Sequence, residues 1–153
     1  MLPLLSQLAD GLYSPQENKM NANLLKVFED AIGQESSGWQ EISVQIASET
    51  LSEFSEENWQ SLLKSVVHRP FFWQERCAEA VGFLEHVQGI PVLIALLGSP
   101  SMQVSSIAAS ELDNMLVILP LPLKDRLLEL KTYLTEKDST RRQDVEGLLS
   151  RLK

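Results

Sequence analysis

The fold of this 153-residue chain is decided by residues 70–115, which read PFFWQERCAEAVGFLEHVQGIPVLIALLGSPSMQVSSIAASELDNM. The stretch divides at Gly89-Ile90-Pro91 and at Gly98-Ser99-Pro100 into three predicted helices. In the last of them apolar side chains recur at the spacing of one helical stripe, at Val104, Ile107, Ala108, Leu112 and Met115. Small residues also recur in the first and last helices, at Ala78, Ala80, Gly82, Ala108 and Ala109. Because small residues let helix backbones approach closely, the sequence predicts that these helices stack on one another.

This pattern resembles the HEAT-like helical repeats, whose second helix opens at a proline turn and runs through a Val-Arg pair into an Ala-rich stripe ending in Leu. The residues that carry the resemblance are Pro100, Val104, Ala108, Ala109 and Leu112, and in the preceding copy Arg76, Ala80, Gly82 and Phe83. The chain departs from the motif at Glu75, which replaces the Val of the first copy, and at Ser105, which replaces the Arg of the second.

The two copies are offset by 29 residues, as in Arg76 and Ser105 or Ala80 and Ala109. This short repeat is similar to the phycobilisome-lyase type of HEAT unit, and the resemblance covers roughly a third of the chain. It implies a small HEAT/armadillo-like α-solenoid whose second helices line a concave face. The alternative interpretation is an irregular helix bundle.

The rest of the chain continues the helical pattern. A leucine stripe at Leu2, Leu5, Leu8 and Leu12 is expected to cap the N-terminal end of the stack, and Ser14-Pro15-Gln16-Glu17 predicts the start of a helix that stops at Gly33. Further helices are predicted from 39 to about 51, from 55 to 69, from 123 to 134 and after Asp138. We therefore expect one all-α domain, residues 1–153, of about eight or nine helices in antiparallel pairs. A polar face on the last helix, bearing Arg141, Asp144 and Arg151, is expected to cap the other end.

The net charge of −8 is distributed unevenly. Residues 1–68 hold ten acidic residues against three lysines, a balance of −7, whereas residues 69–153 balance at −1. Such a charge disfavours nucleic acid as a partner, because phosphate binding depends on clustered Lys and Arg. It favours a basic protein partner. The alternative is that the acidity serves only solubility.

The sequence contains no apolar run long enough to span a bilayer. The start of the chain has no basic residue and carries Asp10 within its apolar stretch, which favours a helix over a signal peptide. The single cysteine, Cys77, lies among small apolar residues and is predicted to be buried. We therefore expect a cytoplasmic protein that does not contact a membrane.

No pattern in the sequence predicts catalysis. His68 and His86 are predicted on different helices without an accompanying metal-binding motif, so no metal site is expected. The neighbouring pair Glu85-His86 points in different directions from a helix. No phosphate-binding loop, dinucleotide fingerprint or nucleophile elbow is present. We therefore predict no catalytic residue, no cofactor and no enzymatic activity.

Aromatic and acidic residues are the candidate contacts for a partner. Each tryptophan either fills a gap between helices or anchors an interface. The run Phe71-Phe72-Trp73 cannot turn all three rings toward one core, so at least one ring is expected at the surface. The predicted partner-binding residues, around the junction of the third and fourth predicted helices, are Glu49, Glu53, Glu56, Glu57, Trp59, Phe72 and Trp73.

The leading functional hypothesis is a protein-binding module, specifically a small acidic inhibitor that neutralises a basic partner by covering its surface. By analogy it is similar to the helical immunity proteins that neutralise bacterial toxins. One alternative is a structural or adaptor subunit of a larger assembly, docked through its end helices, residues 2–13 and 140–152. The other is a cofactor-handling protein like the phycobilin lyases, which would require a reactive Cys77.

Overall fold

The computed structural model describes residues 23–153, and within this range the chain forms helices and no strand. After a first helix, whose described part covers residues 23–32, the α-helices are α2 (Glu41–Ser52), α3 (Glu56–Val66), α4 (Phe71–Leu84), α5 (Ile90–Leu97), α6 (Met102–Asn114), α7 (Lys124–Leu134) and α8 (Ser139–Ser150). Two short 3₁₀ helices precede α5 and α7, at Val87–Gly89 and Leu121–Leu123. The predicted all-α class is confirmed for this range. The predicted leucine stripe and the predicted helix start at 14–17 lie outside the described residues.

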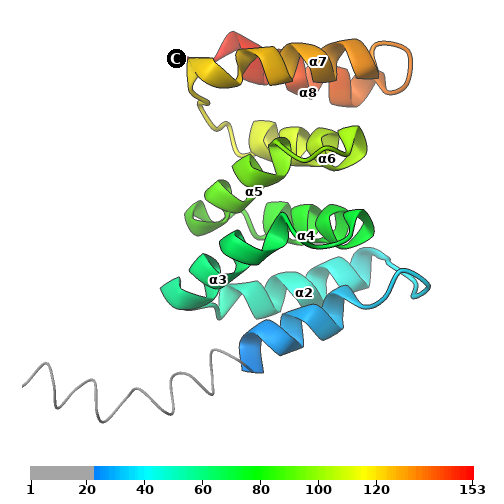
Figure 1. Ribbon diagram of the computed structural model, residues 1–153, viewed down its shortest axis with the longest axis vertical. Coiled ribbons are helices and arrows are strands. Elements are labelled where there is room, and N and C mark those ends of the chain that lie inside the picture. Colours follow the sequence, from blue (N-terminus) through cyan, green and yellow to red (C-terminus); the bar gives the residue numbers. More distant parts are fainter. Residues whose placement is uncertain (1–22) are drawn as a thin grey trace, which may run out of the picture.

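The helices lie one above another in the order of the chain (Figure 1). One column is formed by α2, α4, α6 and α8, in which each helix packs on the next. The second column begins with α3 and α5, which also pack together, while α5 packs on α6 and α7 packs on α8. The predicted stacking within residues 70–115 is therefore confirmed, because α4 and α6 lie side by side. Small residues are fully buried on both helices, at Ala78 and Ala80 of α4 and at Ala108 and Ala109 of α6.

Most helix ends follow the sequence signals. Ser55 accepts a hydrogen bond from the Asn58 amide at the start of α3, and Asp138 accepts one from the Arg141 amide at the start of α8. The predicted end of α4 at Gly89 is wrong. The helix stops at Leu84 because Glu85 adopts a left-handed conformation, with φ of 55°. A non-glycine residue gives no sequence signal for such an end.

Edge-to-face aromatic contacts fill the core of the first layers. Phe28 contacts both Phe54 and Trp73 at centroid distances of 5.7 Å, and Phe54 contacts Trp59 at 5.4 Å. Trp59 and Trp73 are consequently only 5% and 4% exposed. Phe71, by contrast, is half exposed, which confirms that the three consecutive aromatic rings do not share one core.

A buried arginine ties the first turn of the stack to α4. The Arg76 guanidinium donates hydrogen bonds to the carbonyls of Ile32, Gln34 and Ser37 at 2.8, 3.0 and 2.9 Å. These carbonyls belong to the turn that leads into α2, and the guanidinium also lies over the Trp39 ring. Since helix ends leave carbonyls without partners, Arg76 supplies the donors that this turn lacks.

The later turns are held in a similar way. Gln74 donates to the carbonyls of Val66 and Arg69 at 3.1 and 3.0 Å, on the turn between α3 and α4. On the turn between α5 and α6, the Ser105 hydroxyl donates to the Leu97 carbonyl at 2.7 Å. Arg126 of α7 donates to the same carbonyl at 3.1 Å and to the Ser105 hydroxyl at 2.7 Å. A guanidinium from another helix thus also serves this turn. We refer to Arg76, Gln74, Ser105 and Arg126 as the turn-binding residues.

The polar residues predicted to face outward on α8 face α6 instead. Arg151 pairs with Asp113 at 2.7 Å, and Arg141 donates to the Ser110 hydroxyl at 3.4 Å. Asp144 is also hydrogen-bonded to Ser110. The prediction failed because each of the three residues lies three or four positions from the buried Val145 or Leu148, a spacing that places it on their side of the helix. The exposed side of α8 is nevertheless polar, through Ser139, Thr140, Gln143 and Ser150.

Candidate protein-binding surface

A groove around Phe83 lies on the side of the column α2, α4, α6 and α8. Two adjoining hollows of about 350 and 290 Å³ share this side chain, which is 52% exposed. We call this surface the Phe83 groove and define it by Val44, Gln45, Ser48, Glu49, Ser52, Glu79, Phe83, Leu84, Glu111 and Arg141. Every lining residue comes from this one column. The groove therefore results from the stacking of α2, α4, α6 and α8.

Two local contacts position the carboxylates of the groove. The Trp39 indole nitrogen donates a hydrogen bond of 2.7 Å to Glu79 Oε2, which holds this carboxylate on α4 beside the start of α2. Glu111, on α6, rests on Gly82 of α4, where a Cβ atom would lie only 2.0 Å from Glu111 Oε2. The absence of a side chain at Gly82 thus leaves room for the Glu111 carboxylate between two stacked helices.

The groove disfavours ionisation of its own acids. Burial, followed by the charge of Glu79, raises the pKa of Glu111 to about 7, and Glu85 acts in the same direction. Burial and the charge of Glu79 also raise the pKa of Glu75. The cation that opposes the shift at Glu111 is Arg141. Carboxylates from α4 and α6 therefore repel one another here, and their repulsion is only partly offset.

This arrangement is suited to a cationic side chain. A Lys or Arg side chain placed among Glu79, Glu111 and the exposed Phe83 ring would offset the repulsion between the carboxylates. It would also gain a cation–π contact with the ring. The hollows are shallow and open, which suits part of a protein surface better than an enclosed small molecule.

The structure distributes the sequence-predicted residues over several places. Glu49 lines the Phe83 groove, and Glu53, Glu56 and Glu57 are exposed around the turn from α2 to α3. Phe72 is half-buried beneath the Arg76 guanidinium, at 5.2 Å from the ring centroid. Trp73 lies inside the aromatic core, where it fills space between helices.

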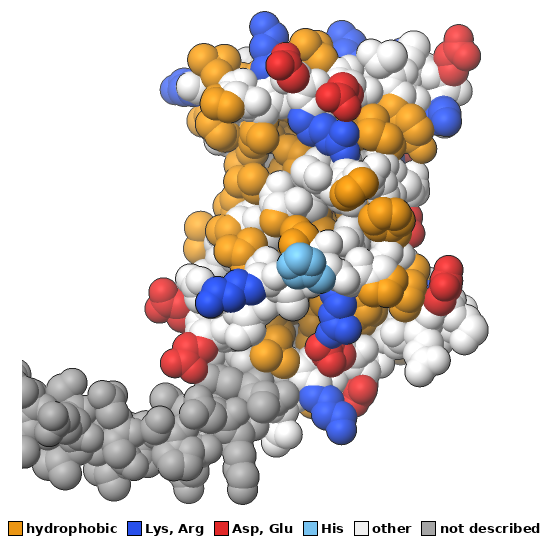
Figure 2. All heavy atoms as spheres, viewed as in Figure 1, with side chains coloured by type: hydrophobic (Ala, Val, Ile, Leu, Met, Phe, Trp, Pro, Cys, Tyr) orange, Lys and Arg blue, Asp and Glu red, His pale blue; other side chains and the backbone are white. Residues whose placement is uncertain are grey.

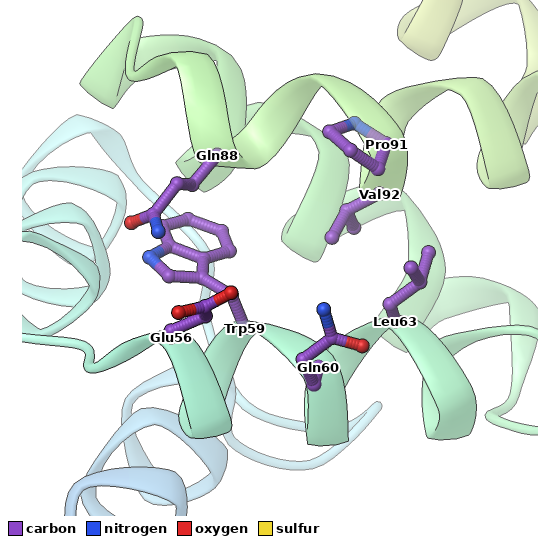
Figure 3. A pocket seen from close by; sticks show the side chains of 7 residues that line it. All are labelled: Glu56, Trp59, Gln60, Leu63, Gln88, Pro91 and Val92. Carbon is purple, nitrogen blue, oxygen red and sulfur yellow. The ribbon is translucent and has the colours of Figure 1, made fainter.

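Glu56 and Trp59 meet in a separate pocket of about 180 Å³ between α3 and α5 (Figure 3). Its other lining residues are Gln60, Leu63, Gln88, Pro91 and Val92. Trp59 is held from another side by His86, which stacks on its ring at 6.3 Å and 9°. In the view of Figure 2, hydrophobic side chains gather over the middle layers, and most charged side chains lie toward the two ends.

The residues considered for chemistry are not assembled into a site. Cys77 is fully buried, and this burial raises the pKa of its thiol strongly. His68 and His86 are both exposed and belong to different segments of the stack. Residues 23–153 contain no group of His, Cys, Asp and Glu side chains that could hold a metal ion. In the same range, no helix combines the length and the apolar composition that a membrane crossing needs.

Sequence reasoning missed Glu79, Phe83 and Glu111 as groove residues. Glu79 and Phe83 are four residues apart on α4, which is a usable signal for a shared helix face. Glu111 lies on another helix, and nothing in its local sequence connects it to that face.

Comparison with known proteins gives no relative, since no protein-family model, no curated protein and no solved structure matches the chain.

Proposed function

We propose that this chain is a protein-binding module that holds a basic partner protein in the Phe83 groove. The observation that carries the proposal is the convergence of Glu79, Glu111 and the exposed Phe83 ring in one hollow. The stacked pairs of helices support a HEAT-like α-solenoid as its architecture, since such stacks present extended surfaces for partners.

The mode of action that we propose is inhibition by occlusion. The acidic charge steers a basic partner toward the groove, and contacts around Phe83 then slow its dissociation. A partner whose functional cations are held by Glu79 and Glu111 is blocked without any chemical step. This is the mode of the helical immunity proteins, to which the chain is similar in its size and acidity.

The raised pKa of Glu111 gives the interaction a pH signature. A bound cation favours the ionised carboxylate, so binding at pH near 6 requires Glu111 to release a proton. The affinity should therefore rise between pH 6 and pH 8 and then level off. Glu111→Gln should remove most of this rise.

Capture of partners from the source cells with three baits tests the proposal. The wild-type chain is compared with the Phe83→Ala/Glu79→Lys variant, and Glu136→Lys serves as a matched control because Glu136 is exposed on the turn between α7 and α8. We expect a basic protein that the wild-type and control baits retain and the groove variant loses. The captured partner is then purified, and its association rate is measured as a function of salt. Retention by all three baits with equal affinity would contradict the groove as the binding site.

The exposed acidic residues that the sequence predicts as partner contacts are tested separately. Reversal of charge at Glu53, Glu56 and Glu57 is expected to slow association with the captured partner and to reduce its salt dependence. An unchanged rate and salt slope would restrict the contact surface to the groove.

An adaptor subunit is a second candidate function. It is favoured by exposed apolar side chains in and after the turn from α6 to α7, where Leu116, Ile118 and Leu121 are each more than half exposed. Light scattering on the purified chain distinguishes the two functions, because a stable homo-oligomer favours the assembly subunit. The burial of Cys77 weighs against a lyase-like activity, which would require an accessible thiol.

A further inference from the structure

The outer side of α2 carries an apolar and acidic stripe that no described helix covers. Ile42, Ile46, Glu49 and Glu53 follow one another at intervals of four, three and four residues, which places them along one side of the helix. All four are exposed, Ile42 by 63% and Ile46 by 50%. The buried residues of α2, including Ala47 and Leu51, face the core. We call these four residues the α2 outer stripe.

The position of α2 in the column explains why its outer side matters. Each later helix of the column packs on the next one, α4 on α2, α6 on α4 and α8 on α6. Within residues 23–153 only the helix at 23–32 precedes α2, and it lies beside α2 at the lower end of the stack (Figure 1) but leaves Ile42 and Ile46 exposed. The outer stripe is therefore at the place where one more helix would continue the same packing.

The two ends of the column differ in chemistry. The exposed side of α8 carries Ser139, Thr140, Gln143 and Ser150, which are polar and suited to water. The exposed side of α2 carries two isoleucines, followed by two carboxylates toward the end of the helix. A solvent-facing end gains nothing from the isoleucines, whereas a docked helix would bury them.

We propose that the α2 outer stripe docks an amphipathic basic helix of a partner protein, which adds one helix to the column. The apolar side of that helix covers Ile42 and Ile46, and its Lys or Arg side chains pair with Glu49 and Glu53. This inference rests on the proposed function only in taking the partner to be a basic protein. It concerns a neighbouring surface that shares only Glu49 with the Phe83 groove, because Ile42, Ile46 and Glu53 do not line that groove.

Charge complementarity selects this occupant over two others. Residues 1–22 of the same chain contain Asp10 and Glu17 against one basic side chain, Lys19, so their side chains carry a net negative charge, as Glu49 and Glu53 do. A second copy of the chain would offer the same stripe, which carries no cation. A basic helix satisfies both the apolar and the acidic half of the stripe.

Calorimetric titration of the full chain with a short leucine/lysine peptide tests the proposal. The peptide is helical and carries its leucines on one side, and a leucine/glutamate peptide of the same pattern is the control. We expect the leucine/lysine peptide to bind and the control peptide to fail. Ile42→Ser/Ile46→Ser should weaken binding by about tenfold or more, and Glu53→Gln by a few fold. Because these side chains are exposed, the variants should fold, which unchanged circular dichroism melting verifies.

Variants elsewhere keep the test specific. Glu136→Gln should leave the peptide affinity within about twofold of the wild type, since Glu136 is exposed on the turn between α7 and α8 and belongs to neither surface. Unchanged affinity in Ile42→Ser/Ile46→Ser overturns the proposal. A peptide affinity that rises by more than about tenfold in Leu5→Ser/Leu8→Ser also overturns the proposal, because the chain's own N-terminal residues would then be the occupant. A dimer that Ile42→Ser/Ile46→Ser dissociates would overturn it in favour of a second copy. The proposed function can fail separately. If the Phe83→Ala/Glu79→Lys variant still binds the captured partner, the groove is not the binding site, but the result of the peptide titration is unaffected.

Discussion

The turn-binding residues and the Phe83 groove are two polar regions of one molecule that differ in how fully their polar groups are paired. Arg76 and Arg126 point at backbone carbonyls and satisfy them with donors from distant helices. Glu79 and Glu111 come together with few cations, and the pKa of Glu111 is raised as a result. The comparison teaches that buried polar groups with complete sets of partners build the stack, whereas incompletely paired acids leave a binding capacity on its surface.

The largest effect is expected for Arg76→Met, which breaks the paired region. The substitution keeps an apolar stem but leaves the carbonyls of Ile32, Gln34 and Ser37 without their donor. The free energy of unfolding should fall by about 3 kcal/mol. Urea unfolding followed by circular dichroism measures this change. A loss below about 1 kcal/mol would mean that water replaces the guanidinium at this turn.

A smaller loss is expected for Arg126→Met, on the turn between α5 and α6. Ser105 continues to donate to the Leu97 carbonyl in this variant, so the turn keeps part of its hydrogen bonding. We expect a decrease of about 1–2 kcal/mol in the free energy of unfolding, by the same urea measurement. The double variant Arg126→Met/Ser105→Ala should lose more than the sum of the two single variants, because each residue partly substitutes for the other.

The partly buried carboxylate of the groove is expected to make the free energy of unfolding depend on pH. Glu111 has a pKa of about 7 in the folded chain, above its ordinary value of 4.5, so the folded state binds the proton more tightly than the unfolded state. Stability should therefore decrease as the pH rises from 4.5 to 7 and stay level above that range. Because Glu111 is partly exposed, solvent screening reduces the change to about 1 kcal/mol. The free energy of unfolding of Glu111→Gln, measured between pH 5 and pH 8, should not show this decrease.

The smallest change in stability is expected for Gly82→Ala. The added methyl group displaces the Glu111 carboxylate, while alanine favours the helix by about 0.5–1 kcal/mol over glycine. These effects nearly cancel in the free energy of unfolding. The pKa of Glu111 should nevertheless fall toward its ordinary value, since the carboxylate moves into solvent, and carbon-detected NMR titration of this side chain measures the shift. An unchanged pKa would show that the carboxylate finds an equally buried position.

The sequence predicted those parts of the fold that depend on local pattern. The recurring alanines of α4 and α6 placed these helices side by side, and Ser55 and Asp138 marked the starts of α3 and α8. The end of α4 could not be predicted, because it depends on a left-handed backbone at Glu85. The role of Arg126 was equally hidden, since its partner Ser105 lies 21 residues earlier on another helix.

The candidate surface was predicted only in part, for an electrostatic reason. The charge balance pointed to residues 1–68, and Glu49 does line the groove. Glu79 and Glu111 lie in the half whose charges nearly balance, but arginines of that half are engaged with turns or with α8 contacts. A local excess of acidic side chains therefore depends on the direction in which each arginine side chain points. The charge balance of a sequence segment does not give this direction.

The tryptophans make one half of the molecule spectroscopically distinct from the other. Trp39, Trp59 and Trp73 all precede α5, and the later helices contain none. Their emission therefore reports the integrity of the first layers alone, while the far-ultraviolet dichroism of the backbone reports all helices together. If the column opens from its C-terminal end, the dichroic signal will begin to decline before the indole emission changes, and the interval between the two transitions will measure how strongly neighbouring layers are coupled.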